Sequence, residues 1–110
     1  METRFIPITQ STEWEAVRQR SEEGPILLFK HDPFCSISLR AYRELAGLGG
    51  DVTVLDVAES QPLSMDVASQ TGVEHESPQV IVVRDGEAAW SASHFDITAP
   101  AVAAALAALT

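Results

Sequence analysis

The sequence predicts an α/β fold, a single domain over residues 1–110 in which a central mixed sheet carries helices on both faces. Apolar runs of strand length alternate with segments of helical periodicity, a pattern typical of parallel β-α-β units. Towards the C-terminus this alternation stops, and two strand-like runs flank an Asp-Gly pair, which indicates an antiparallel hairpin. The chain has 110 residues and a hydrophobic fraction of 45%, which suits one conventional core.

The first half of the chain is predicted to form strand, helix, strand and helix in that order. Residues 5–8 form a short edge strand, where Pro7 is tolerated. A helix opens with the capping-box spacing of residues 12–15 and ends before Gly24. Residues 26–29 form a strand covered on both faces. A second helix ends at Gly49-Gly50, and its apolar face consists of Phe34, Ile37, Ala41, Leu45 and Leu48.

The second half adds a strand, a helix, a hairpin and a last helix. The strand is expected at 52–57, and the helix runs from about Pro62 to Thr71 before Gly72. The hairpin joins residues 79–83 to residues 88–92. Either Thr98 or Asp96 caps the last helix, which has Pro100 in its first turn. The order β-α-β-α-β-α-β-β-α is the thioredoxin arrangement, so the sequence predicts a thioredoxin-like fold.

Composition excludes several classes of function. Seven basic residues stand against sixteen acidic ones, giving a net charge of −9, which argues against binding to nucleic acid. No apolar run is long enough to span a membrane, and the N-terminus lacks a secretory signal, so we expect a cytoplasmic protein. One cysteine cannot form an internal disulfide, and no Cys and His pair has zinc-finger spacing, so we expect no metal site.

Cys35 is the candidate nucleophile, because it follows the second strand and begins the next helix. Free N–H groups and a partial positive charge at a helix N-terminus favour a thiolate. The alternative is that Cys35 is a small buried apolar residue. Ser38 stands where a Cys-x-x-Cys protein has its second cysteine, so the chemistry must be monothiol. Its hydroxyl could hydrogen-bond the thiolate, or Ser36 and Ser38 could serve only as first-turn caps.

Other candidate site residues come from loops that the topology brings to the same end of the sheet. The Ser77–Pro78 bond precedes the fourth strand, where thioredoxin-like proteins hold a cis-proline opposite the nucleophile. Three histidines also fall at this end, and they are His31, His75 and His94. Partly protonated imidazoles there would favour a thiolate or an anionic thiol substrate, unless they are merely solvated loop residues.

Three blocks of sequence resemble the monothiol bacilliredoxins of the YtxJ type. The first is Lys30-His31, three residues, and then Cys35-Ser36-Ile37-Ser38. The second covers residues 72–80, and the third comprises residues 84–86, Trp90 and residues 93–98. In that family proline usually follows the cysteine and a small hydroxyl residue follows the histidine, whereas this chain has Ser36 and Asp32.

The resemblance implies a reductase for proteins that carry bacillithiol as a mixed disulfide. Cys35 would attack the bacillithiol sulfur, and a second bacillithiol would regenerate it. The residues expected to support the thiolate or to bind substrate are His31, Ser36, Ser38, His75, Ser77, Pro78 and His94. No cofactor is expected to bind tightly. Bacillithiol, glutathione or coenzyme A would be the co-substrate, and S-thiolated client proteins the partners. The alternative is a thioredoxin-fold stress-response binding or redox-sensing module, in which Cys35 is only S-thiolated.

Overall fold

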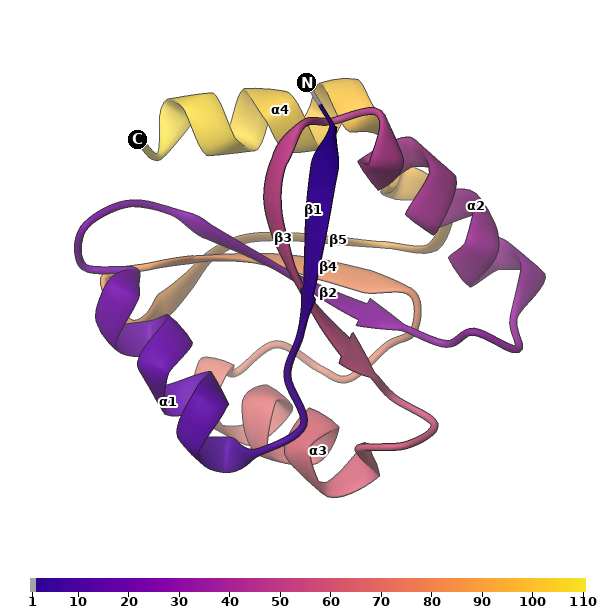
Figure 1. Ribbon diagram of the computed structural model, residues 1–110. Coiled ribbons are helices and arrows are strands. Elements are labelled where there is room, and N and C mark those ends of the chain that lie inside the picture. The colour runs from indigo at the N-terminus through magenta and orange to yellow at the C-terminus, as the bar shows by residue number, and fades with distance from the viewer. Residues whose placement is uncertain (1) are drawn as a thin grey trace.

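A five-stranded mixed sheet forms the centre of the computed structural model, which describes residues 2–110 (Figure 1). The strand order is β1-β3-β2-β4-β5. β3 pairs in parallel with β1 and β2, whereas β4 is antiparallel to both β2 and β5. This confirms the predicted mixed sheet. The strands are β1 (Thr3–Pro7), β2 (Ile26–His31), β3 (Gly50–Asp56), β4 (Gln79–Arg84) and β5 (Glu87–Ser93).

Helices cover both faces of the sheet, as the sequence predicted (Figure 1). α1 (Ser11–Arg20) and α3 (Gln61–Thr71) lie on one face, and α2 (Ser36–Ala46) and α4 (Ala99–Ala108) lie on the other. A short 3-10 helix, η1 (His94–Asp96), leads from β5 towards α4. Among residues 2–110, no helix has the length and apolar character needed to cross a membrane.

The central strand β2 divides the core into two parts. Its residues Leu27 and Phe29 pack in the cluster that includes the buried residues of α2 and α4. Leu28 packs in the second cluster, with residues of α1 and α3. Successive side chains of a strand point to opposite faces, so the apolar run of β2 supplies both clusters at once.

Local turn chemistry fixes several boundaries where they were predicted. Asp85 and Gly86 both have positive φ, 55° and 77°, as a type I′ hairpin turn requires. Gly72 ends α3 in the left-handed conformation with φ 74°. Of the two predicted caps of α4, Thr98 is the one used, since its Oγ1 accepts the N–H of Ala101. Asp96 lies in η1 instead.

The predicted start of α1 is wrong. The helix begins at Ser11 with Gln10 as its N-cap, not at the spacing of residues 12–15. Glu13 Oε1 accepts the backbone N–H groups of Gln10 and Thr9, at 3.1 and 2.9 Å. Two overlapping four-residue segments here end in a glutamate, residues 10–13 and residues 12–15. The earlier segment caps the helix.

The predicted apolar face of α2 is correct for its centre and wrong for Phe34. Ala41 and Leu45 are buried, but Phe34 is 88% exposed and precedes the helix, which begins at Ser36. Asp32 Oδ1 accepts the N–H of Phe34 at 3.0 Å and closes a turn before Cys35. Helical periodicity therefore does not apply to Phe34.

Replacing Leu28 with alanine tests the division of the core. Leu28 is fully buried between the sheet and the α1–α3 layer, so Leu28→Ala should lower the free energy of unfolding by about 2–5 kcal/mol. Met65 on α3 is 51% exposed, so the matched Met65→Ala change should alter the free energy of unfolding by no more than about 0.5 kcal/mol. Urea unfolding followed by tryptophan fluorescence measures both. Equal losses in the two variants would contradict the assignment of Leu28 to the core.

Candidate active site

Cys35 is the N-cap residue of α2, at the carboxyl end of β2. Its backbone is extended, with φ −108° and ψ 126°, and its carbonyl accepts the first helical hydrogen bond, from Leu39 N at 3.0 Å. The side chain is a partly exposed free thiol. An N-cap side chain lies beside the N–H groups of the first turn, which have no partner within the helix. This position favours a negatively charged group, as the sequence suggested.

The short loop that leads to Cys35 is held by Asp32. Besides the contact with Phe34 N, the carbonyl of Asp32 accepts the N–H of Cys35 at 3.1 Å. The carboxylate of Asp32 thus belongs to the turn. Next to this loop lies an open hollow of about 340 Å³, lined by Pro33, Phe34, Asp56, Ala58 and Glu59.

Ser38 joins the end of β2 to the first turn of α2. It is fully buried, and its Oγ accepts the N–H of Asp32 at 2.9 Å. The same oxygen forms a hydrogen bond with His31 Nδ1 at 2.7 Å. The His31 ring also stacks on Phe29 and packs at a tilt against Tyr42. In the described chain the hydroxyl of Ser38 therefore serves His31 and Asp32, and not the thiolate that the sequence suggested. Ser36 is exposed on the first turn of α2.

The three histidines lie at one end of the sheet, as predicted, but they do not form one cluster. His31 ends β2, His75 lies in the loop before β4, and His94 begins η1. The His31 side chain packs towards α2, whereas His75 packs towards α3, so the sheet separates them. His94 Nδ1 lies 3.9 Å from Glu76 Oε2.

For two of the three histidines the pKa shifts against the expected partly protonated imidazoles. Burial lowers the pKa of His31, and the charges of Asp56 and Asp32 offset this only in part. Burial also lowers the pKa of His75, and the positive charge of Lys30 lowers it further. Both imidazoles are thus uncharged near neutral pH and act as hydrogen-bond partners.

The loop of residues 72–78 ends in the cis Ser77–Pro78 bond, as the sequence predicted. Pro78 is buried and its carbonyl accepts the N–H of His94 at 3.0 Å, while Ser77 is half-buried. The next residue, Gln79, pairs with Lys30 on β2. Pro78 therefore lies at the end of the sheet from which the Cys35 loop leaves.

Lys30 lies at the same end of the sheet as the Cys35 loop, and it was not predicted as a site residue from the sequence. It is fully buried, and its Nζ lies 3.2 Å from both Ser64 O and His75 Nδ1. Burial lowers its pKa to about 8. A signal was present in the sequence, because the chain's only lysine directly follows the apolar run of a strand predicted to be covered on both faces.

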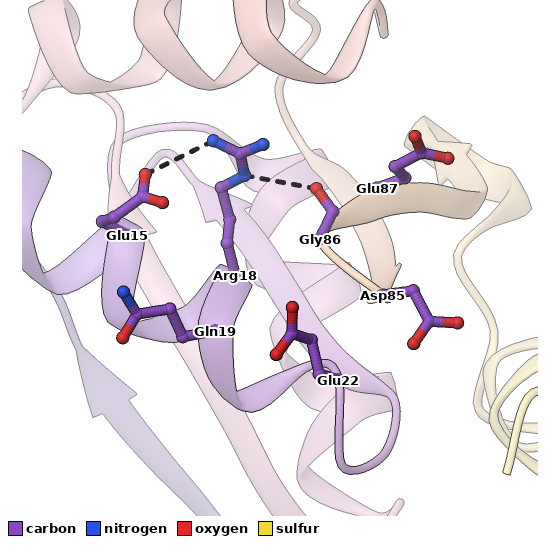
Figure 2. Close-up of a pocket in the computed structure, with 7 residues that line it drawn as sticks. All are labelled: Glu15, Arg18, Gln19, Glu22, Asp85, Gly86 and Glu87. Atoms are coloured by element: carbon purple, nitrogen blue, oxygen red, sulfur yellow. Dashed lines mark hydrogen bonds and ion pairs between the residues drawn. The ribbon is translucent and has the colours of Figure 1, made fainter.

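A second hollow, of about 220 Å³, lies at the opposite end of β4, beside the hairpin turn (Figure 2). The Arg18 guanidinium spans it and donates to Gly86 O at 3.2 Å and to Glu15 Oε2 at 3.3 Å. None of the predicted site residues lines this hollow. The predicted site residues lie at the other end of β4, from which the Cys35 loop leaves.

Comparison with known proteins identifies the fold. A solved structure provisionally described as an oxidoreductase with a thioredoxin fold is 31% identical, with a TM-score of 0.82 over 92% of each chain. Fasciola hepatica thioredoxin has a TM-score of 0.75 at 9% identity, over 96% of this chain and 99% of its own. Trypanosoma brucei brucei thioredoxin has a TM-score of 0.74 at 11% identity, over 96% and 89%. The fold is thioredoxin-like, as the element order predicted.

Residues 6–102 match the family model described as monothiol bacilliredoxin BrxC. This match covers most of the chain, and it includes the Cys35 loop, the cis-proline loop and η1. With an accessible thiol at the helix tip and a thioredoxin-like oxidoreductase fold, the function is thiol redox chemistry. The chain belongs to the monothiol bacilliredoxin family.

Proposed function

We propose that the protein removes bacillithiol, or a similar low-molecular-weight thiol, from protein mixed disulfides, with Cys35 as the nucleophile. The observation that carries this proposal is the free thiol of Cys35 at the N-cap of α2, with a buried serine three residues later. The thiol can attack a disulfide, but Ser38 cannot take over the resulting bond.

The proposed exchange has two balanced steps. In the first, the Cys35 thiolate attacks the bacillithiol sulfur of the client mixed disulfide. A Cys35–bacillithiol disulfide forms, the old disulfide breaks, and the client leaves as a thiolate that takes a proton from water. In the second, the thiolate of a free bacillithiol attacks the adduct, releasing Cys35 and forming bacillithiol disulfide. The client cysteine is reduced and the free bacillithiol is oxidised, while the bacillithiol sulfur that left the client stays at the disulfide level throughout.

The surroundings of Cys35 support access by a large substrate. Phe34 projects into solvent directly before the thiol, and the hollow beside it is open. The partners in this proposal are S-thiolated client proteins and the small thiol. The compartment is a reducing one such as the cytoplasm, where small thiols stay reduced.

Replacement of Cys35 tests turnover. Cys35→Ser should abolish release of a bacillithiolated client, because no other sulfur nucleophile exists in the chain apart from two thioethers. Mass spectrometry of client and protein follows release and the bacillithiol adduct over time. Met65→Ala, which alters an exposed residue on α3 outside the site, should retain release and serves as the control. If the native protein gains bacillithiol without releasing further client in excess bacillithiol, it is a redox-sensing module instead of an enzyme.

A cysteine at position 38 tests the monothiol step. Ser38→Cys creates the Cys-x-x-Cys spacing, so the new thiol should displace bacillithiol from Cys35 and form an internal disulfide. The adduct that accumulates on the native protein, when free bacillithiol is withheld, should then be replaced by a species two mass units lighter than the reduced variant. Ser36→Cys adds a thiol beside Cys35 without this spacing, and its adduct should persist. Persistence in both variants would contradict the assigned role of position 38.

A further inference from the structure

Lys30 is an unusual residue in this fold, since the chain's only lysine has 0% of its surface exposed. The ion pairs among residues 2–110 do not include it. Burying an ammonium group without a carboxylate partner is unfavourable, and this burial is what lowers the pKa of Lys30 to about 8. The hydrogen bonds of this ammonium group must therefore offset the cost of its burial.

Those hydrogen bonds reach two segments on the α3 face of the sheet. Lys30 Nζ donates to Ser64 O on α3 and to His75 Nδ1 in the 72–78 loop, each at 3.2 Å. An ammonium group can only donate, so His75 Nδ1 accepts and the ring proton lies on Nε2. The lowered pKa of His75 agrees with this, because a second proton would set two donors against each other.

The cross-strand neighbour of Lys30 holds the same loop. Gln79 pairs with Lys30 in the sheet and is buried, and its Nε2 donates to Glu74 O at 3.0 Å. Two adjacent residues of the loop, Glu74 and His75, are therefore fixed from a cross-strand pair beneath them. The loop then reaches Pro78, whose carbonyl accepts the N–H of His94.

We propose that Lys30 is a positioning residue, which through His75 holds the 72–78 loop and Pro78 beside the loop that carries Cys35. For its effect on catalysis this inference rests on the proposed function, but the effect on the loop does not depend on it. The groups that face Lys30 are Ser64 from α3, His75 from the loop and Gln79 from β4. His75 is the titratable one among them, and Glu76 acts on it in turn.

Removing the amine should free the loop. In Lys30→Met, which keeps an unbranched apolar stem, amide hydrogen exchange at residues 73–77 should be about tenfold faster than in the native protein. Leu28→Met is the matched control, since it lies two residues earlier on the same face of β2 and should leave that exchange unchanged. His75→Leu should behave like Lys30→Met, whereas His75→Gln retains an acceptor and should be closer to native. Unchanged exchange in Lys30→Met, or equal acceleration in Leu28→Met, would overturn the proposal.

The catalytic consequence can be separated from a general loss of stability. With a bacillithiolated peptide as substrate, Lys30→Met should raise KM about tenfold and change kcat by less than about twofold, because the thiol itself is retained. A fall in kcat with KM unchanged would overturn the positioning role. Inactivity of the native protein would instead refute the proposed function. The hydrogen exchange at residues 73–77 would still test whether Lys30 holds the loop.

The native protein provides a test that needs no variant. Labelling lysine at Cε yields one signal, which should titrate near pH 8 instead of 10.5, and should also shift as His75 titrates below 6.5. Because the unfolded chain binds more protons between pH 8 and 10.5, Lys30 makes the free energy of unfolding rise with pH across that window. In Lys30→Met this contribution should be absent. A lysine signal that titrates at 10.5 and ignores His75 would contradict the contact.

Discussion

The alternation of side chains along β2 is the constraint on which both halves of the site depend. Leu27 and Phe29 are fixed in one core cluster and Leu28 in the other, so the last two residues must also point to opposite faces. Lys30 therefore reaches α3 and the 72–78 loop, and His31 reaches α2. A shift of one residue in register would exchange these contacts and disconnect both loops from the sheet.

This division also sets the electrostatics around the thiol. Buried polar groups at the end of β2 need hydrogen-bond partners. On one side of the sheet His75 is the partner of Lys30, and on the other side His31 is the partner of Ser38. The burial that makes these contacts strong is the same burial that lowers both pKa values. The imidazoles thus stabilise loop geometry, and the helix N-terminus at Cys35 remains the positive element next to the thiol.

Features with local causes were predictable from the sequence, and features that depend on distant burial were not. The Asp85-Gly86 turn, the stop at Gly72 and the helix-tip position of Cys35 each follow from residues adjacent in sequence. The exposure of Phe34 was missed because the Asp32 turn interrupts helical periodicity. Lys30 was missed for a different reason: lysine is almost never fully buried, and only the complete sheet with α3 shows what encloses it.

The two sides of the Cys35 loop differ in their exposure to solvent. Ser38 is buried in the first turn of α2 and hydrogen-bonds His31 and Asp32, so this turn is tied to the end of β2 and offers no second thiol. On the solvent side Phe34 is exposed and the neighbouring hollow is open. A disulfide formed at Cys35 would thus lie at the end of a hydrogen-bonded helix turn and remain accessible to solvent. Monothiol chemistry requires this combination, because the thiol that resolves the adduct must come from solution.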